Sequence, residues 1–296
     1  MSGANHRNTQ LNCNDFRSVA RALTIVENDL DGAGRLLKDL KFTGNTPIIG
    51  ITGPPGAGKS TLVTCLIGDL VSKGNKVAVL AVDPTSPFNF GSLLGDRIRM
   101  SPYFNHPGVF IRSLATRGSL GGLSAKTIEM SDVLRAAGFD HVLIETVGVG
   151  QSEIEIAGLA DITFVVLVPE GGDEIQNIKS GLMEIADAFI VNKADRDGAD
   201  MFANNLKKMV KQKAEHIPVF KTIASQSSGI TEISDFIFSS TDKINHRKEY
   251  LLAAKAYKII QEKKMAGIDK AKLQRAIQKA MNEPQFNLYS FVEEYL

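Results

Sequence analysis

The sequence predicts a doubly wound, mostly parallel α/β sheet with helical extensions at both ends of the chain. Short apolar runs rich in β-branched residues alternate with helical patterns between about residues 47 and 237. Strands that read as continuous apolar runs are buried on both faces, which is typical of a parallel sheet covered by helices. Helical spacing without strand signals, before and after this region, predicts the two extensions.

The predicted elements follow one another in a regular order. Apolar side chains recur at helical spacing from Phe16 to Leu30, and Asp31-Gly32 separates this helix from a shorter one around residues 36–40. Strands are then predicted for PIIGIT, KVAVLAV, GVFIR, HVLIE, ITFVVLV, AFIVN and IPVF. Helical patterns return over about 242–265 and 269–281. We expect an N-terminal helical extension over residues 1–44, an α/β domain over 45–240 and a C-terminal helical region over 241–296.

Composition and charge narrow the class of protein. The 296 residues include 34 Lys and Arg against 33 Asp and Glu, so no excess charge favours binding to nucleic acid or to an anionic membrane. Cys13 and Cys65 lie far apart, which disfavours a disulfide framework and a cysteine zinc site. His106 and His141 flank strands, where a hydrogen-bonded structural role is expected. With no apolar signal region or membrane-length run, we expect a protein of the reducing cytoplasm.

A glycine-rich turn joins the first predicted strand to a helix that begins near Lys59. The turn and the helix start read Gly53-Pro54-Pro55-Gly56-Ala57-Gly58-Lys59-Ser60-Thr61, which contains G-x-x-x-x-G-K-[ST] in its required strand–loop–helix context. Glycines let backbone N–H groups curl around a β-phosphate, and the helix N-terminus adds a positive dipole. Lys59 can reach the β- and γ-phosphate oxygens, and the Ser60 hydroxyl can bind Mg²⁺. This pattern predicts the phosphate-binding loop (P-loop) of a nucleotide-binding protein.

A second loop indicates which base is bound. Asn192-Lys193-Ala194-Asp195 directly follows strand AFIVN and matches the N-K-x-D pattern. The Asp195 carboxylate can accept hydrogen bonds from N1–H and the exocyclic amine of guanine, a donor pair that adenine lacks. The next strand end, Ile223-Ala224-Ser225, stands where backbone amides would contact the guanine carbonyl. We therefore expect GTP and GDP as ligands.

Acidic residues at strand ends predict a metal site beside the phosphates. Glu145 ends strand HVLIE and opens a D-x-x-G-like motif, in which Gly148 would sense the γ-phosphate and start a switch. Asp83 directly follows strand KVAVLAV, and Asp96 lies in the segment after it. Asp96 could equally be a solvated helix cap. The predicted ligands of Mg²⁺ are Ser60, Asp83, Asp96 and Glu145.

With these motifs in place, the sequence resembles the MeaB/ArgK family of P-loop GTPases, formerly called LAO/AO transport ATPases. The matching strings include GITGPPGAGKSTL, VDPTSP followed by GSLLGDRIRM, ETVGVGQSE, and GGDEIQNIKSGLMEIADAFIVNKAD. The resemblance implies a SIMIBI-class G domain over 45–240 that acts as a homodimer. It also implies that GTP binding and hydrolysis assist cobalamin loading and protection of methylmalonyl-CoA mutase or a related acyl-CoA mutase. Phe88-Asn89-Phe90 and Ser119 depart from the family pattern, which leaves the role of Phe88 and Phe90 open.

The resemblance further implies how a partner would act on hydrolysis. The segment from Glu170 to Lys179 resembles an extra switch loop of the family, in which Asp173 and Lys179 would move to the nucleotide. From the residues alone, a helix N-cap at Asp173 and a solvated Lys179 are the simpler interpretation. The predicted catalytic residues are Lys59, Asp173, Lys179 and Gln151, with Glu153 an equal alternative to Gln151 for positioning water. We expect slow intrinsic GTP hydrolysis that the mutase accelerates.

Other functions stay open at this point. A GTPase chaperone for another metalloenzyme, of the nickel type, needs a Cys/His site that the sequence lacks. An ArgK-like kinase linked to amino-acid transport fits the older family name, and a nucleotide-gated scaffold without hydrolysis is a third alternative. In the C-terminal helices, Leu251, Leu252, Tyr257 and Ile260 suggest dimerisation, although these helices could also pack on the chain's own α/β domain.

Overall fold

The computed structural model describes residues 11–83, 99–115, 125–146, 152–169, 182–211, 217–240, 247–265, 267–282 and 286–295. The chain divides into two compact units, Met1–Lys248 and Glu249–Leu296. The first unit contains the sheet, and the described part of the second unit is helical. The domain bounds expected from the sequence stay a prediction.

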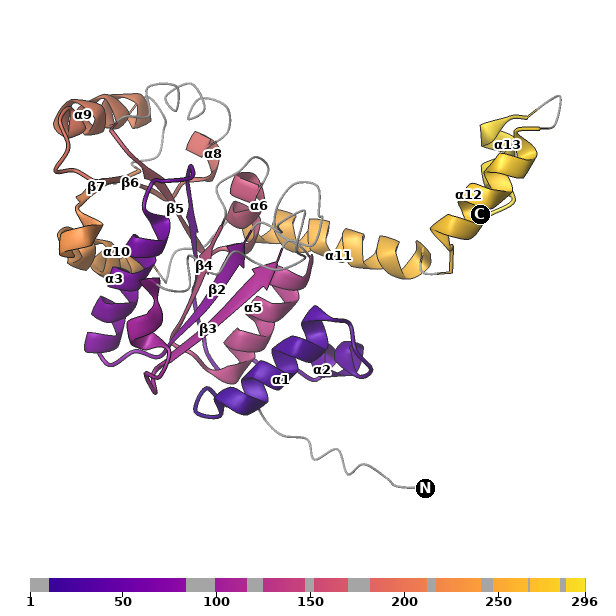
Figure 1. Ribbon diagram of the computed structural model, residues 1–296, viewed down its shortest axis with the longest axis horizontal. Helices are drawn as coiled ribbons and strands as arrows, with labels where there is room; N and C mark the ends of the chain where they lie inside the picture. Colours follow the sequence, from indigo (N-terminus) through magenta and orange to yellow (C-terminus); the bar gives the residue numbers. More distant parts are fainter. Residues whose placement is uncertain are drawn as a thin grey trace. The chain divides into compact units, whose positions relative to one another are not determined.

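One parallel sheet forms the centre of the first unit (Figure 1). Its strands are β1 (Ile48–Thr52), β2 (Val77–Asp83), β3 (Val109–Ala115), β4 (His141–Glu145), β5 (Ile162–Leu167), β6 (Ala188–Asn192) and β7 (Val219–Thr222). They lie in the order β3-β2-β4-β1-β5-β6-β7, and every neighbouring pair is parallel. Each strand overlaps one of the apolar runs from which it was predicted.

Helices cover both faces of this sheet. Among the described residues of the unit, the α-helices that cover the sheet or flank it are α1 (Phe16–Glu27), α2 (Ala33–Lys38), α3 (Lys59–Ser72), α5 (Ala125–Ala137), α6 (Ser152–Leu159), α8 (Met183–Ile185), α9 (Ala199–Val210) and α10 (Ile230–Ser240). Adjacent residues of a strand point to opposite faces, so Ile49 packs with α3 and α10 whereas Ile48 packs with α1, α5 and α6. A third apolar cluster joins α8 and α9 to β5 and β6. The predicted doubly wound α/β class is confirmed.

The strand order places a crevice at the carboxyl ends of the central strands. β1 lies between β4 and β5, so the connections run to opposite sides of β1 in the sheet. The register pairs Ile51 with Glu145 and Thr52 with Val165, which brings these strand ends to one edge. Ligands of open α/β sheets bind at such a switch point.

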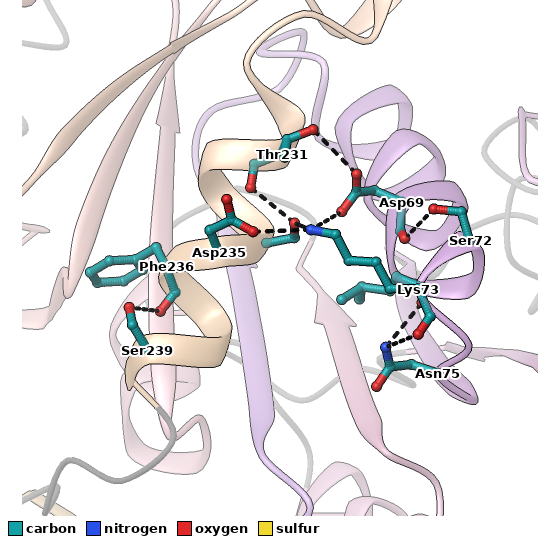
Figure 2. Close-up of polar contacts among 10 residues, drawn as sticks. Asp69, Ser72, Lys73, Asn75, Thr231, Asp235, Phe236 and Ser239 are labelled. Atoms are coloured by element: carbon teal, nitrogen blue, oxygen red, sulfur yellow. Dashed lines mark hydrogen bonds and ion pairs between the residues drawn. The ribbon is translucent and has the colours of Figure 1, made fainter.

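Figure 2 shows the polar contacts that hold α10 against α3. Lys73, the residue after α3, forms ion pairs with Asp69 (2.9 Å) and Asp235 (3.1 Å), and its Nζ donates to Ser234 Oγ (2.5 Å). The ammonium also lies 5.4 Å from the centre of the Phe238 ring. Burial alone would raise the pKa of Asp69, but hydrogen bonds from Ser234 and Lys73 outweigh burial and lower it. The helix α3 begins at the glycine-rich loop, and these contacts attach its other end to α10.

The N-terminal helices pack against the β3 side of the sheet. Asp15 caps α1 by accepting a hydrogen bond from the Ser18 N–H (3.1 Å). Glu27, at the other end of α1, forms an ion pair with Arg112 of β3 (2.6 Å). Contacts between α1 and α5 complete the attachment (Figure 1). The predicted N-terminal helices are therefore part of the first unit.

The C-terminal helices are α11 (Arg247–Met265), α12 (Lys270–Ala280) and α13 (Leu288–Glu293). Asp269 caps α12 and Asn287 caps α13, each through its side-chain oxygen. Several large apolar side chains of this unit are exposed, namely Leu252, Tyr257, Ile260, Met265, Met281, Leu288, Tyr289, Val292 and Tyr295. None of the helices in the described ranges is long and apolar enough to cross a membrane.

Candidate nucleotide-binding site

The glycine-rich loop connects β1 to α3 in a conformation that only glycine adopts easily. Gly53, Gly56 and Gly58 have φ values of 140°, 79° and 86°. A Cβ on Gly53 would meet the Val166 carbonyl oxygen at 2.1 Å, and a Cβ on Gly58 would meet Asn192 Nδ2 at 2.4 Å. The N-cap residue of α3 is Gly58, which has no side chain with which to cap the helix, and this leaves the first N–H groups of the helix available to an anion. This is the geometry expected of a phosphate-binding loop.

Lys59 begins α3 and folds back over the loop. Its Nζ donates to the carbonyl oxygens of Gly53 (2.8 Å) and Pro54 (3.0 Å), and the residue is only 7% exposed. The ammonium is therefore held where phosphate oxygens would compete with these carbonyls for it.

Oxygen atoms meet at the ends of β1, β4 and the first turn of α3. Ser60 Oγ donates to Glu145 Oε1 (2.6 Å), and both residues are 6% exposed. Thr146, the next residue, donates its hydroxyl to Thr52 Oγ1 (2.9 Å). A buried carboxylate with a hydroxyl beside it is the hard-oxygen donor set that Mg²⁺ takes. Two of the four predicted metal ligands are thus brought together.

The other predicted metal and switch residues are only partly described. Asp83 is the last residue of β2, and because Ala81 pairs with Glu145, its backbone lies at the same edge of the sheet. The side chain of Asp83 lies outside the described residues. Asp96 and Gly148 also lie outside them, as do Gln151, Asp173, Lys179, Phe88 and Phe90, and the Glu153 side chain.

Asn192 joins the N-K-x-D loop to the phosphate loop. Its Nδ2 donates to the carbonyl oxygen of Ala57 (2.8 Å). Its Oδ1 accepts from Thr222 Oγ1 (3.0 Å) and from the Ala224 N–H (3.2 Å). The next residue, Lys193, has a φ of 56° and donates its Nζ to the Gly56 carbonyl oxygen (2.7 Å). The two loops are therefore built as one structure.

The remaining base-loop residues surround this junction. Asp195 is exposed, so its carboxylate is accessible to a guanine base. Ile223 pairs with Ser228 in a short bridge, and the buried Ala224 starts a 3₁₀ turn, η3 (Ala224–Gln226). Ser225 is exposed. Asp195 and residues 223–225 are not among the residues that line the phosphate cavity.

A cavity of about 530 Å³ lies over the loop and the strand ends. The described residues that line it are Pro55, Gly56, Gly58, Lys59, Ser60, Thr61, Ala81, Val82, Arg99, Glu145, Thr146 and Lys193. No role was predicted from the sequence for Thr146 or for Arg99. Thr146 lies within the predicted E-T-V-G motif, and Arg99 lies within the quoted string GSLLGDRIRM. Both motifs were recognised, but nothing in the sequence distinguishes these two residues from their neighbours.

The two histidines differ from each other. The Nδ1 of His106 accepts from the Gly108 N–H (3.1 Å), which fits the expected hydrogen-bonded structural role. His141 begins β4, is 4% exposed, and has no hydrogen-bond partner for either ring nitrogen among the described residues. Its ring instead packs edge-on to Phe238 at 5.4 Å. The expectation of a hydrogen-bonded His141 is therefore wrong, because the apolar packing of β4 against α10 encloses the ring.

The fold and the site define the class of protein: a P-loop NTPase whose N-K-x-D loop sits against the phosphate loop at the switch point of a parallel sheet. Residues 19–282 match the family described as methylmalonyl-CoA mutase-associated GTPase MeaB. The chain belongs to this family and is a GTPase that binds GTP and GDP.

Known proteins agree with this assignment. A protein of Pyrococcus horikoshii named as a GTPase is 49% identical over 245 residues, which cover 80% of this chain and 75% of that protein. A mouse protein named methylmalonic aciduria type A homolog, mitochondrial, is 46% identical over 149 residues, covering 50% of this chain and 36% of the relative. A crystal structure described as LAO/AO transport system kinase has a TM-score of 0.66 at 25% identity and covers 95% of this chain and 92% of its own.

Proposed function

We propose that this GTPase couples its nucleotide cycle to cobalamin loading and protection of methylmalonyl-CoA mutase or a related cobalamin-dependent acyl-CoA mutase. The observation that carries the proposal is the match of residues 19–282 to a family of mutase-associated GTPases. The similarity to the mouse protein named for methylmalonic aciduria supports the same client class.

In this proposal the cavity over the P-loop holds the phosphates of GTP. Lys59 exchanges the carbonyl oxygens of Gly53 and Pro54 for β- and γ-phosphate oxygens. The amides of residues 53–61 bind the β-phosphate, Asp195 binds guanine, and backbone groups of Ile223, Ala224 and Ser225 complete the base site. We assign Gln151 to water positioning, with Glu153 as the alternative, and Asp173 and Lys179 to a partner-driven step.

Mg²⁺ fits the oxygen atoms at the strand edge. Ser60 and Glu145, 2.6 Å apart through Oγ and Oε1, would hold it together with Asp83 and Asp96. When bound there, Mg²⁺ neutralises charge on the β- and γ-phosphate oxygens. Glu145→Gln should therefore weaken GTP binding most in the presence of Mg²⁺, and an equal loss with EDTA would contradict this ligand set.

A direct test compares GTP hydrolysis by the full chain with and without purified methylmalonyl-CoA mutase. We expect the mutase to raise the rate, and we expect co-purification of the two proteins when a non-hydrolysable GTP analogue is bound. Asp195→Asn, which loses the guanine contact, should abolish both effects with GTP. Equal rates with and without mutase, together with no co-purification, would remove the mutase from the proposal while leaving GTP hydrolysis in place.

A second candidate is phosphoryl transfer to an acceptor, which the description of the crystal structure as a transport system kinase favours. GTP labelled on the γ-phosphate, incubated with the chain and amino-acid-binding proteins, would distinguish the two functions. Label on the acceptor supports a kinase, and label only in free phosphate supports the GTPase chaperone.

We further propose a homodimer formed through the C-terminal unit, and a reducing compartment such as the cytoplasm. The exposed apolar side chains of α11 to α13 support the first proposal. The free thiols of Cys13 and Cys65 support the second.

A further inference from the structure

Arg99 is the one cation among the described residues lining the phosphate cavity that the P-loop and N-K-x-D motifs leave unexplained. It is exposed and lines the same cavity as Lys59, Ser60 and Glu145. We propose that Arg99 binds the terminal phosphates of GTP and thereby favours the triphosphate over GDP. This inference rests on the proposal that the cavity holds the phosphates of the nucleotide.

The backbone of Arg99 is fixed while its side chain is exposed. The next residue, Met100, is 1% exposed and belongs to the apolar cluster of α3 and α10. The carbonyl oxygen of Met100 accepts from the Tyr103 N–H (3.0 Å), which starts the 3₁₀ turn η1 (Ser101–Tyr103). A side chain that leaves an anchored backbone reaches a limited region of space, and here that region adjoins the cavity.

The position of the Arg99 backbone indicates which end of the cavity its side chain reaches. Thr64 lies one turn after Ser60 on α3 and donates its hydroxyl to the Ser60 carbonyl oxygen (2.7 Å). The same hydroxyl lies 3.4 Å from the carbonyl oxygen of Arg99. The backbone of Arg99 therefore lies beside the face of α3 that carries Ser60, and Ser60 contacts Glu145. We infer that the Arg99 side chain binds the β- and γ-phosphates.

The other described cations of the cavity are already engaged with the loop. Lys59 donates to Gly53 and Pro54, and Lys193 donates to Gly56. Within the described ranges, no hydrogen bond or ion pair joins the guanidinium of Arg99 to a side chain. A guanidinium presents a planar set of donors that binds two phosphate oxygens at once. Mg²⁺ and one lysine offset only part of the charge of a triphosphate, so a second cationic side chain at this end would stabilise the bound triphosphate further.

The test measures the affinity of the full chain for GDP and for a non-hydrolysable GTP analogue, by titration with fluorescent nucleotides in Mg²⁺. Arg99→Ala should weaken binding of the analogue about ten- to a hundredfold and of GDP less than about threefold. Arg99→Lys should recover part of the loss, because it keeps the charge without the fork. Arg21→Ala removes an exposed arginine of α1 that does not line the cavity, and it should match the wild type.

The ratio of the two affinities separates the possible failures. Partial unfolding lowers both affinities together, so an equal loss for GDP and the analogue, or no loss at all, overturns the role of Arg99. Lys59→Ala examines the cavity itself. If Lys59→Ala binds both nucleotides like the wild type, the proposed site is wrong and the inference falls with it. If Lys59→Ala loses binding while Arg99→Ala keeps the wild-type ratio, only the inference on Arg99 is wrong.

Discussion

Gly58 and Asn192 show how single residues couple phosphate binding to base binding. Gly58 is left-handed, with a φ of 86°, and stands so close to Asn192 that a Cβ would lie 2.4 Å from Nδ2. Asn192 in turn holds the Ala57 carbonyl and the Ala224 amide. The glycine that the P-loop pattern requires for its backbone is thus also required by the base loop.

The comparison of Gly58→Ala with Gly56→Ala tests this double requirement. Both positions are left-handed, so each substitution should cost about 1–2 kcal/mol in backbone strain. Only Gly58→Ala also displaces the Asn192 amide, because a Cβ on Gly56 would have no heavy atom within 4 Å. We expect Gly58→Ala to weaken GTP binding at least about tenfold more than Gly56→Ala, measured by nucleotide titration. Similar losses in the two variants would mean that the contact with Asn192 does not matter.

His141 is a buried titratable group that makes stability depend on pH. Burial lowers the pKa of His141 below its ordinary value of 6.5, more strongly than the neighbouring Asp140 raises it. The unfolded chain therefore binds a proton at this side chain more readily than the folded chain does. The free energy of unfolding should fall as the pH drops below about 6.5, and the fall ends below the folded pKa.

Replacing His141 should remove this part of the acid sensitivity. We expect the loss of stability between about pH 7 and pH 5 to be smaller in both His141→Phe and His141→Gln, where a tenfold difference in proton affinity corresponds to about 1.4 kcal/mol. Urea unfolding at a series of pH values measures the effect, and each variant is compared with its own stability at pH 8. Curves parallel to that of the wild type would show that His141 titrates alike in the folded and unfolded chain.

At the scale of elements, the contact between α3 and α10 depends on Lys73. Its ammonium contacts Asp69 of α3 and both Ser234 and Asp235 of α10 (Figure 2). It also lies 5.4 Å from the centre of the Phe238 ring. Side chains exposed by 31% at Lys73 and 18% at Asp69 place this ion pair between the surface and the interior. Such a network is worth more than an isolated surface pair.

Lys73→Met keeps most of the length of the side chain and removes its charge. We expect the variant to lose about 1 kcal/mol of unfolding free energy, and the difference from the wild type to shrink in high salt. Lys41→Met, at an exposed loop position, is the matched control and should change stability by less than about 0.5 kcal/mol. A stability of Lys73→Met equal to that of the control would show that apolar packing alone holds α10.

The elements themselves were predictable from the sequence, but their junctions were not. ITFVVL and AFIVN are buried along their whole length in a parallel sheet, so their composition alone identifies them as strands. The bonds from Asn192 to Ala57 and from Lys193 to Gly56 join residues far apart in the chain, and no local pattern specifies them. Arg99 and His141 were unassigned or misread for the same reason, since the cavity around one and the packing around the other arise only on folding.

At the scale of the whole molecule, the chain consists of a nucleotide-binding unit and a helical unit with exposed apolar side chains. Lys59, Glu145 and Asn192 all belong to the first unit, whereas Tyr257 and Ile260 belong to the second. A change in the second unit should therefore leave the nucleotide site intact. This division allows assembly and nucleotide binding to be tested independently.

Tyr257 and Ile260 of α11 are 71% and 55% exposed and stand three residues apart, on one face of the helix. If this face forms the proposed dimer interface, two carboxylates introduced on it would be buried against the same residues of the second chain. The free-energy cost of burying these unpaired charges should dissociate the dimer. We expect the wild type to be a dimer by light scattering, and Tyr257→Glu with Ile260→Glu to be a monomer with unchanged GDP affinity. Lys208→Glu, exposed on α9 of the first unit, controls for charge and should stay dimeric. A dimeric double variant would place the interface elsewhere, and a monomeric wild type would contradict the homodimer itself.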